Sequence, residues 1–263
     1  MRILFIGDVV GKPGREALRA RLGGLREVQH ADFVIANGEN VAGGSGITRS
    51  TFSVLREAGI DVVTGGNHTF KQREALALVA SEPSILRPDN FPPGVGVPGQ
   101  GAGVFETSDG HRVGVLNLLG RVNLGSYEDP FSWGLREAAA LRQETPIVIV
   151  DFHAEVTSEK VALGWHLDGH VSAVIGTHTH VQTADERILP QGTAFITDVG
   201  MTGPHDSVLG VKREIVIQRF LDQMPCRFEV AKEGVRINAV CIEVDEASGR
   251  ALSIARISEP VEL

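Results

Sequence analysis

The sequence is poor in cysteine, with only Cys226 and Cys241 among its 263 residues. Two cysteines are too few for a disulfide framework, and neither belongs to a CxxC pair. We therefore expect two ordinary thiols in a reducing compartment.

Long apolar runs are also absent. The N-terminal segment MRILFIGDVVG has a short apolar run, Ile3 to Ile6, before Gly7 and Asp8. This run is too short for a signal peptide, and no other run approaches the roughly 18 apolar residues of a membrane span. The sequence thus predicts a cytoplasmic protein with no membrane partner.

Positive charge is scarce too, because 25 Lys and Arg residues face 33 Asp and Glu residues, for a net charge of -8. This balance argues against a broad basic surface, so contact with RNA or an anionic membrane is not indicated by charge. A small phosphate-bearing substrate stays compatible, since bound metal cations can supply local positive charge.

What the sequence does contain is a series of short apolar runs separated by helix-like stretches. The chain length and 42% hydrophobic content suit a single domain over residues 1–263. Continuously apolar runs are typical of strands buried on both faces, and their alternation with helices indicates an α/β fold. The runs are RILFIGD, ADFVIANGEN, DVVTGGNH, RVGVLNLLG, TPIVIVDFHAE, VSAVIGTHTH and GTAFITDVG.

Helix and loop signals separate these runs. Pro13 predicts the start of one helix, and Thr48 predicts the cap of a second helix that ends at Gly59. Residues 91–103 are rich in Pro and Gly and predict irregular structure. Residues 121–145 could form a small cap.

The C-terminal tail has a different pattern. Its strand-like runs begin with RFEV and are separated only by Glu233-Gly234 and Ser248-Gly249, which leaves no room for crossover helices. We therefore expect antiparallel strands there.

Residues able to bind metals follow six of the seven apolar runs. In an open α/β sheet, ligands bind beyond the carboxyl ends of the strands, so these residues should meet in one crevice. They are Asp8, then Asn37, Glu39 and Asn40, then Asn67 and His68, then His153 and Glu155, then His178 and His180, and finally Asp198.

Mixed oxygen and imidazole ligands without a thiolate suit iron, manganese or zinc better than calcium. A carboxylate such as Glu39 can bridge two cations about 3.5 to 4 Å apart, and a hydroxide held between them can attack phosphorus. The sequence therefore predicts a dinuclear-metal phosphoesterase. Its six principal ligands would be Asp8, Glu39, Asn67, His153, His178 and His180.

His178 and His180 are two residues apart, so in an extended chain they would point the same way and address both metals. Other polar side chains could form a hydrogen bond with the second ring nitrogen of His153 or with a neighbouring ligand. The candidates are Asp151, Glu155, Thr177 and Thr179.

The motifs Gly-Asp, Gly-Asn-His and Gly-Thr-His-Thr-His together resemble the calcineurin-like metallophosphoesterase superfamily, which implies an αββα sandwich with mixed sheets. Val9 and Val10 follow Asp8, so the first-motif histidine of that superfamily is missing, and Glu39 replaces the usual bridging aspartate. A closer resemblance, to the bacterial YmdB-like phosphodiesterases, accounts for both departures. It extends over essentially the full length, in GDVVGKPGR, NGENVAGGSGIT, TGGNHTF, DFHAE, GTHTHVQTAD and TDVGMTGP.

The YmdB-like resemblance implies two metal sites that share Glu39. One would be formed by Asp8, Glu39, Asn40 and His180, and the other by Glu39, Asn67, His153 and His178. The resemblance also implies iron as the native metal, with manganese or zinc as alternatives, and cyclic nucleotides as substrates, particularly 2′,3′-cyclic AMP. His68 would protonate the leaving oxygen, a role that suits a histidine beside cations. A symmetric homo-oligomer is allowed.

Two alternatives stay open. The same site could hydrolyse phosphomonoesters as a nucleotidase, or the chain could be a regulator that binds nucleotide or RNA and uses metals only to hold phosphate. The GGSG segment at residues 43–46 lacks the Lys-Ser/Thr ending of a phosphate-binding loop, and we interpret it as a turn. We interpret the remaining polar candidates as loop anchors (Asp198, Thr202 and His205) or as surface and structural histidines (His30, His111, His166 and His170).

Overall fold

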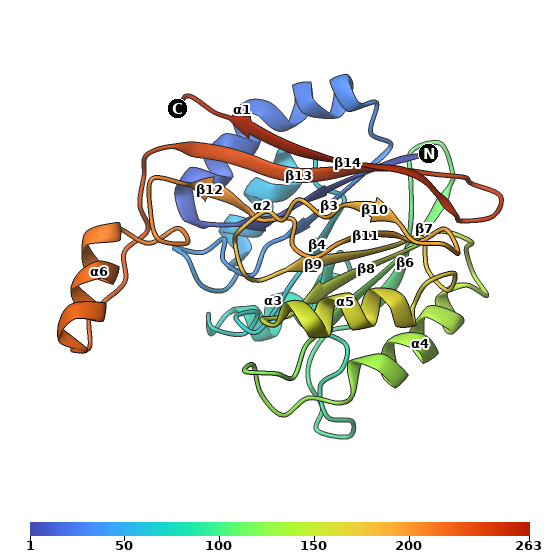
Figure 1. Ribbon diagram of the computed structural model, residues 1–263, viewed down its shortest axis with the longest axis horizontal. Coiled ribbons are helices and arrows are strands. Elements are labelled where there is room, and N and C mark those ends of the chain that lie inside the picture. The colour runs from blue at the N-terminus through green and yellow to red at the C-terminus, as the bar shows by residue number, and fades with distance from the viewer.

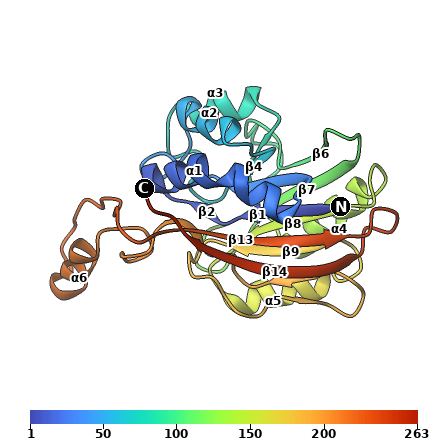
Figure 2. The ribbon, with the colours of Figure 1, turned by 90° about the horizontal axis from the view of Figure 1, so that it is seen from above.

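Two mixed β-sheets lie face to face at the centre of the computed structural model, which describes residues 1–263 (Figure 1). Helices cover the outer face of each sheet, and Figure 2 shows α1, α2 and α3 on one side of the sheets and α5 on the other. This arrangement confirms the predicted α/β class and the αββα sandwich.

The first sheet has eight strands in the order β2-β12-β13-β1-β3-β4-β5, with β14 on the other side of β13. Strands β1, β3, β4 and β5 are parallel, whereas β13 is antiparallel to both β1 and β14. The strand bounds are β1 Arg2–Ile6, β2 Asp8–Val9, β3 Phe33–Asn37, β4 Val62–Thr64, β5 Ile85–Leu86, β12 Met201–Pro204, β13 Val235–Val244 and β14 Ala251–Pro260.

The second sheet has six strands in the order β10-β11-β9-β8-β7-β6. Its four central strands are parallel, and its two edge strands are antiparallel to their neighbours. The bounds are β6 Ala102–Glu106, β7 Arg112–Leu119, β8 Val148–His153, β9 Ala173–Thr177, β10 Arg187–Ile188 and β11 Ala194–Ile196.

Six helices complete the fold, and the sequence predicted two of their termini. Thr48 caps α2 through a reciprocal pair of hydrogen bonds with Thr51, as expected from its position. Pro13 lies in the first turn of α1, where its missing N–H is not needed. The bounds are α1 Gly11–Gln29, α2 Arg49–Glu57, α3 Ala75–Ser81, α4 Pro130–Leu141, α5 Thr157–His166 and α6 Arg213–Asp222.

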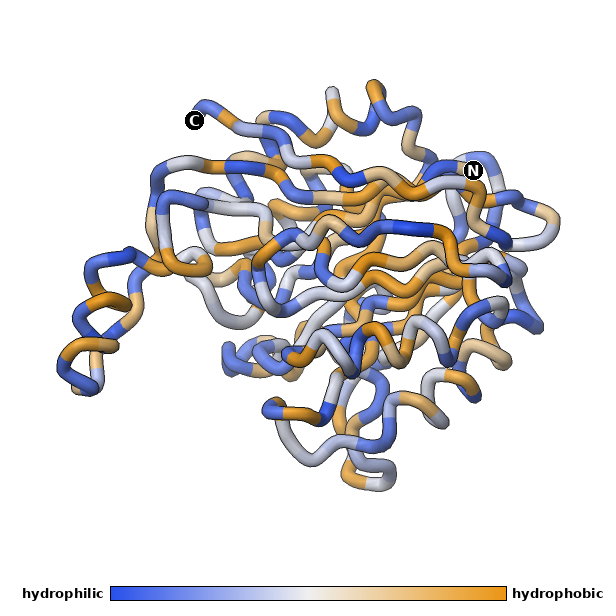
Figure 3. Tube along the Cα trace, viewed as in Figure 1, coloured by the Kyte–Doolittle hydropathy of each residue, from blue (hydrophilic) through white to orange (hydrophobic).

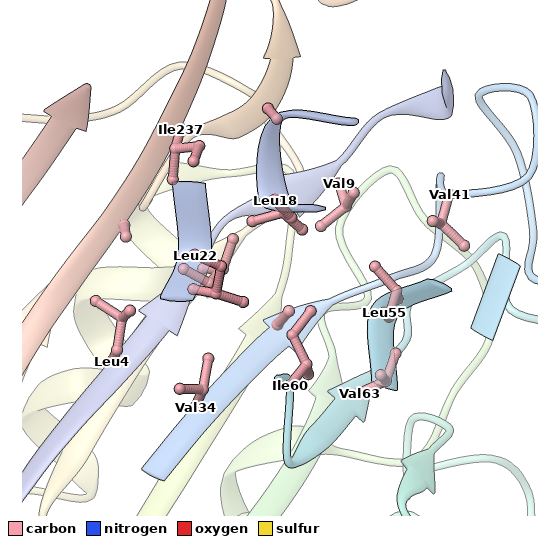
Figure 4. Packing of buried hydrophobic residues seen from close by; sticks show 14 of the residues in the cluster. Leu4, Val9, Leu18, Leu22, Val34, Val41, Leu55, Ile60, Val63 and Ile237 are labelled. Carbon is pink, nitrogen blue, oxygen red and sulfur yellow. The ribbon is translucent and has the colours of Figure 1, made fainter. Parts of the chain in front are cut away.

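Apolar side chains fill the three spaces between these layers. Phe5 of β1 and Ile149 of β8 lie in the cluster between the two sheets. Leu18 and Leu22 of α1 pack against the first sheet (Figure 4). Figure 3 shows the apolar strands gathered in the middle of the molecule. Because both sheets share one core, we propose that residues 1–263 form a single domain.

Several local predictions needed correction. RFEV at residues 227–230 does not form a strand, because its only β-bridge is the isolated one between Val230 and Val211. The irregular segment 91–103 gives way to β6 at Ala102. Residues 121–145, the expected cap, contain α4, which packs against β7 and β6, preceded by a loop over residues 121–129. The antiparallel pairing of β13 with β14 around Ser248-Gly249 is confirmed.

None of the six helices combines the length and the hydrophobicity that crossing a membrane requires.

Candidate functional site

The polar residues that follow the parallel strands do meet in one place, as the strand order requires. Asn37 ends β3 and His153 ends β8, while the other candidates lie just beyond β3, β4 and β9, or begin β2. Hydrogen-bond or near-contact distances link all eight residues of the predicted site. These residues are Asp8, Glu39, Asn40, Asn67, His68, His153, His178 and His180.

One cluster is centred on the Nε2 atom of His153, which is fully buried. This nitrogen lies 3.0 Å from Nδ1 of His178 and 3.1 Å from Oδ1 of Asn67. It also lies 3.4 Å from Oε2 of Glu39. Four lone-pair donors therefore face one another, and three of them, from Glu39, His153 and His178, form a group that could hold a metal ion.

A second cluster adjoins the first through Glu39. Nδ2 of Asn40 donates to Oε1 of Glu39 at 3.0 Å and lies 3.2 Å from Nε2 of His180. The same His180 nitrogen is 3.8 Å from Oδ1 of Asp8. The two clusters thus share one carboxylate, with one oxygen of Glu39 toward each.

The arrangement of these side chains suits coordination of a cation better than hydrogen bonding among themselves. Oδ1 of Asp8 is buried without any hydrogen-bond partner, an arrangement that is costly unless a cation or water completes it. One ring nitrogen of His153 cannot bond well to three neighbours at once, whereas convergent lone pairs are what a metal requires. Gly66 backs this space, since a Cβ there would stand 2.3 Å from Oε2 of Glu39 and 2.5 Å from Nε2 of His153.

Hydrogen bonds behind the histidines set their ring orientations. Oγ1 of Thr177 donates to Oδ1 of Asp151 at 2.7 Å and can accept from Nδ1 of His153 at 2.9 Å, so when the ring gives up its second proton the lone pair is on Nε2. Asp151 therefore acts through Thr177 and does not contact the ring directly. Glu155 contacts Nε2 of His178 instead, at 2.9 Å.

The loop that carries His178 and His180 is not extended, so that part of the prediction was wrong. β9 ends at Thr177, and the two histidines have left-handed φ angles of 101° and 65°. Such strain in non-glycine residues persists only where the surroundings hold it. Here Nδ1 of His180 donates to the carbonyl oxygen of Leu209 at 2.9 Å, which leaves Nε2 facing the site.

Asp198 anchors this loop through Thr179, which lies between the two histidines. Its Oδ2 accepts from the main-chain N of Thr179 at 3.0 Å and from the Thr179 hydroxyl at 2.8 Å. The same oxygen lies 2.5 Å from Nζ of Lys160, and both charged side chains are buried. The predicted anchoring role of Asp198 is therefore confirmed.

The two histidines of the first cluster have pKa values shifted in opposite directions. Burial would lower the pKa of His153, but the carboxylates of Glu39, Asp8 and Asp151 raise it to about 9. Burial and the nearby charge on His153 lower the pKa of His178 to about 3. Burial would raise the pKa of Glu39, yet His153 and His68 hold it well below its ordinary value. Without metal, the site is thus a charged pair, Glu39 and His153, beside a neutral His178.

The side chain of His68 is 32% exposed, unlike the buried side chain of Glu39 beside it. Its main-chain N donates to Oε2 of Glu39 at 2.8 Å. Its Nδ1 is 2.8 Å from Oδ1 of Asn40 and 3.2 Å from Oε1 of Glu39. Since Nδ1 is engaged, Nε2 is the nitrogen left for a substrate.

Some supporting residues escaped the sequence analysis. Lys160 and Leu209 follow no motif, and Thr64 donates to Asp151 from the end of β4. For Lys160 a weak signal existed, because it occupies the apolar face of α5 with Leu163. The expected anchors Thr202 and His205 make contacts with main-chain oxygens of Asn238 and Met201.

Known proteins are similar to this chain in sequence and in fold. A 2′,3′-cyclic-nucleotide 2′-phosphodiesterase from Bacillus subtilis is 47% identical over 257 residues, which cover 98% of this chain and 96% of the relative. A crystal structure of a novel phosphatase from Mycoplasma pneumoniae superposes with a TM-score of 0.92 at 39% identity, covering 99% of this chain and 93% of that one.

A more distant structure shares the fold alone. The sulfate thiohydrolase SoxB of Thermus thermophilus, solved in complex with glycerol, has a TM-score of 0.59 at 12% identity and covers 96% of this chain but 43% of that one. The family model described as YmdB-like protein matches residues 4–257. The chain is therefore a phosphoester hydrolase with a metallophosphoesterase-type fold, and it belongs to the YmdB-like family.

Proposed function

We propose that this hydrolase cleaves small phosphodiesters and that 2′,3′-cyclic nucleotides are among its substrates. The main support within the chain is the convergence of His178, Asn67 and Glu39 on Nε2 of His153, beside the unpartnered Oδ1 of Asp8. The Bacillus subtilis relative, a 2′,3′-cyclic-nucleotide 2′-phosphodiesterase, supports the choice of substrate.

The residues would hold two metal ions, iron in the first place and manganese or zinc as alternatives. Asp8, Glu39, Asn40 and His180 would form one site, and Glu39, Asn67, His153 and His178 the other. Two such cations, when bound, neutralise phosphoryl charge and lower the pKa of water. Oxygen and imidazole ligands accept all three metals, so availability decides among them.

His68 would donate the proton that the leaving alkoxide needs, and Asn40 would set the position of that proton on the His68 ring. In the structure, Nδ2 of Asn40 faces His180. Ligation through Oδ1 requires the amide to turn, and Nδ2 would then donate to Nδ1 of His68. His68 would in that case carry its proton on Nε2 and could give it to the leaving alkoxide.

Two other functions compete with this one. A phosphomonoesterase would use the same residues, and selectivity between cyclic nucleotides and simple monoesters separates the two. A regulator that binds nucleotide or RNA without turnover would keep its metals and bind tightly, yet hydrolyse no phosphodiester. The net charge of -8 disfavours a broad RNA-binding surface.

Elemental analysis paired with an activity screen tests the proposal. We expect close to two transition-metal ions per chain and hydrolysis of 2′,3′-cyclic nucleotides after supply of iron, manganese or zinc. Glu39→Gln should lose both metals and activity, because Glu39 faces both clusters. His111→Gln, on the surface near Asp109, is the matched control and should keep both. Less than one metal per chain, with no activity after metal supply, would rule the proposal out.

We also propose a cytoplasmic location and a homo-oligomer formed through the arm, defined as residues 205–234, which includes α6. The arm projects from the body of the molecule (Figure 1) and exposes Ile217, Phe220 and Leu221. At its base, Phe228 and Pro13 line a cavity of about 760 Å³. Exposed apolar side chains on a projecting helix suit an interface between two copies.

A further inference from the structure

A second cavity, of about 480 Å³, lies beside the metal-binding residues and shares His180 with them. The loop after β9 forms one wall, and β13 and β14, the red strands of Figure 1, form another. Arg236 and Arg256 are among its eleven lining residues, and none of the eleven is acidic. In a chain with 33 Asp and Glu residues, this composition favours an anionic ligand.

Asn238 is the clearest sign that the cavity is built to bind something. The residue is only 3% exposed, and Oδ1 of its side chain is buried with no partner. Its contacts with Thr202 and Gly7 use only main-chain atoms of Asn238: its carbonyl oxygen accepts from Oγ1 of Thr202 and from N of Gly7, and its N–H donates to Oγ1 of Thr202. Oδ1 is an acceptor, and a buried acceptor left unpaired is costly, so a water or a ligand hydroxyl in the cavity is expected to donate to it.

The two arginines are held in place with donors to spare. Nε and Nη2 of Arg236 donate to Oγ and the carbonyl oxygen of Ser258, both at 3.1 Å, so Nη1 stays available. Nε of Arg256 lies 2.6 Å from Oε2 of Glu186, which leaves its terminal nitrogens available. Glu186 offsets one positive charge, and Arg236 supplies the other. Fixed guanidinium groups of this kind suit phosphate oxygens.

His180 connects the cavity to the metal-binding residues. Nε2 of its ring faces Asn40 and Asp8. Its Nδ1 donates to the carbonyl oxygen of Leu209, a residue that also lines the cavity. The imidazole ring of His180 therefore lies between the two spaces, so one substrate could reach both.

We propose that this cavity binds a second phosphate of the substrate, the 5′-phosphate of a nucleotide whose 2′,3′-cyclic phosphate reacts. The inference rests on the proposed function and narrows the substrate class to nucleotides phosphorylated at the 5′ position, including the 3′-terminal nucleotide of an oligonucleotide. Arg236 and Arg256 would bind this group and take no part in bond cleavage.

The test compares adenosine 2′,3′-cyclic phosphate with its 5′-phosphorylated form. For the wild-type enzyme we expect kcat/KM to be about tenfold or more higher with the 5′-phosphate, as for one charged hydrogen-bonded contact. Arg236→Gln should remove most of this preference while leaving kcat/KM for the unphosphorylated substrate within about twofold. Arg213→Gln, an exposed arginine on α6, is the control and should keep the preference.

Arg256→Gln provides a second variant should Arg236→Gln fold poorly. No wild-type preference, or equal loss on both substrates, would overturn the inference. Binding of inorganic phosphate that depends on Arg236, without any substrate preference, would mean a free-phosphate site and would also overturn it.

Failure of the proposed function would look different, since neither nucleotide would be hydrolysed. The cavity is then tested by calorimetric binding of adenosine 5′-phosphate to the metal-loaded protein. Weaker binding to Arg236→Gln than to wild type supports the inference, and equal binding contradicts it.

Discussion

At the scale of single residues, His68 differs from Glu39 and Asn40 beside it because its side chain is 32% exposed and only Nδ1 of its ring contacts them. Its Nδ1 contacts Asn40 and Glu39, so the ring is held without depending on a metal. His68→Ala should therefore retain its metals and lose activity by about 10²- to 10⁴-fold in kcat, as for loss of a general acid.

Metal content and kcat for the two variants His68→Ala and His178→Ala provide the check. His178→Ala should lose metal along with activity, because His178 faces His153 in the first cluster. If His68→Ala instead loses metal in parallel with activity, His68 supports the ligands and is not the acid.

The pKa of His153 predicts how pH controls metal loading. At neutral pH the metal-free protein holds His153 protonated, since its pKa is about 9, whereas His178, with a pKa of about 3, is already neutral. Metal binding must displace the His153 proton, so apparent affinity should rise about tenfold per pH unit below pH 9.

Calorimetric titration with Mn²⁺ between pH 6.5 and 8.5, in buffers of different ionisation enthalpy, measures this effect. About one proton released per chain at neutral pH is expected for the first cluster. An affinity independent of pH over this range would contradict a protonated His153.

At the scale of elements, α5 supports the histidine loop through a buried ion pair. Lys160 is 1% exposed and Asp198 is 0% exposed, and their partner atoms lie 2.5 Å apart. Lys160→Met would leave the Asp198 charge buried and unpaired, which should cost about 3 to 5 kcal/mol of unfolding free energy. Metal affinity should fall as well, because Asp198 holds Thr179 between His178 and His180.

Urea denaturation and metal titration measure the two effects separately. Lys12→Met replaces a lysine that is 74% exposed and should change stability by less than about 0.5 kcal/mol. The double variant Lys160→Met/Asp198→Asn removes both charges and should regain part of the lost stability. Wild-type stability in Lys160→Met would show that Asp198 needs no partner.

The strands with ligands at their ends were predictable because each is a continuous apolar run with a polar residue at its carboxyl end. His153 after VIVDF is an example, and the parallel pairing of β8 with β9 brings it beside Thr177. The helix cap at Thr48 was predictable for a similar local reason.

Features that depend on distant packing were not predictable. Lys160 and Asp198 are 38 residues apart, and only the packing of α5 on β9 buries the pair. The left-handed turns at His178 and His180 depend on Leu209 and Asp198, which no local pattern signals. RFEV has the composition of a strand but no neighbouring strand to pair with, so composition alone misled.

At the scale of the whole molecule, the arm exposes apolar side chains that no contact within a single chain covers. Phe220 is 75% exposed, Leu221 is 76% exposed and Met224 is 62% exposed. Figure 3 shows both apolar and polar positions on the projecting segment that Figure 1 labels α6. Exposed apolar side chains clustered on one projecting helix are typical of an interface between chains.

We therefore expect the wild-type protein to be a homo-oligomer in solution, and Phe220→Ser/Leu221→Ser to shift it toward monomer, as measured by size-exclusion chromatography with light scattering. Val28→Ser replaces a residue that is 73% exposed on α1 and is the matched control. The arm variant should keep its metals, because no ligand lies on α6. A wild-type protein that stays monomeric on concentration would remove the arm's proposed role. An oligomer unaffected by the double substitution would show that the interface does not include the exposed side chains of Phe220 and Leu221.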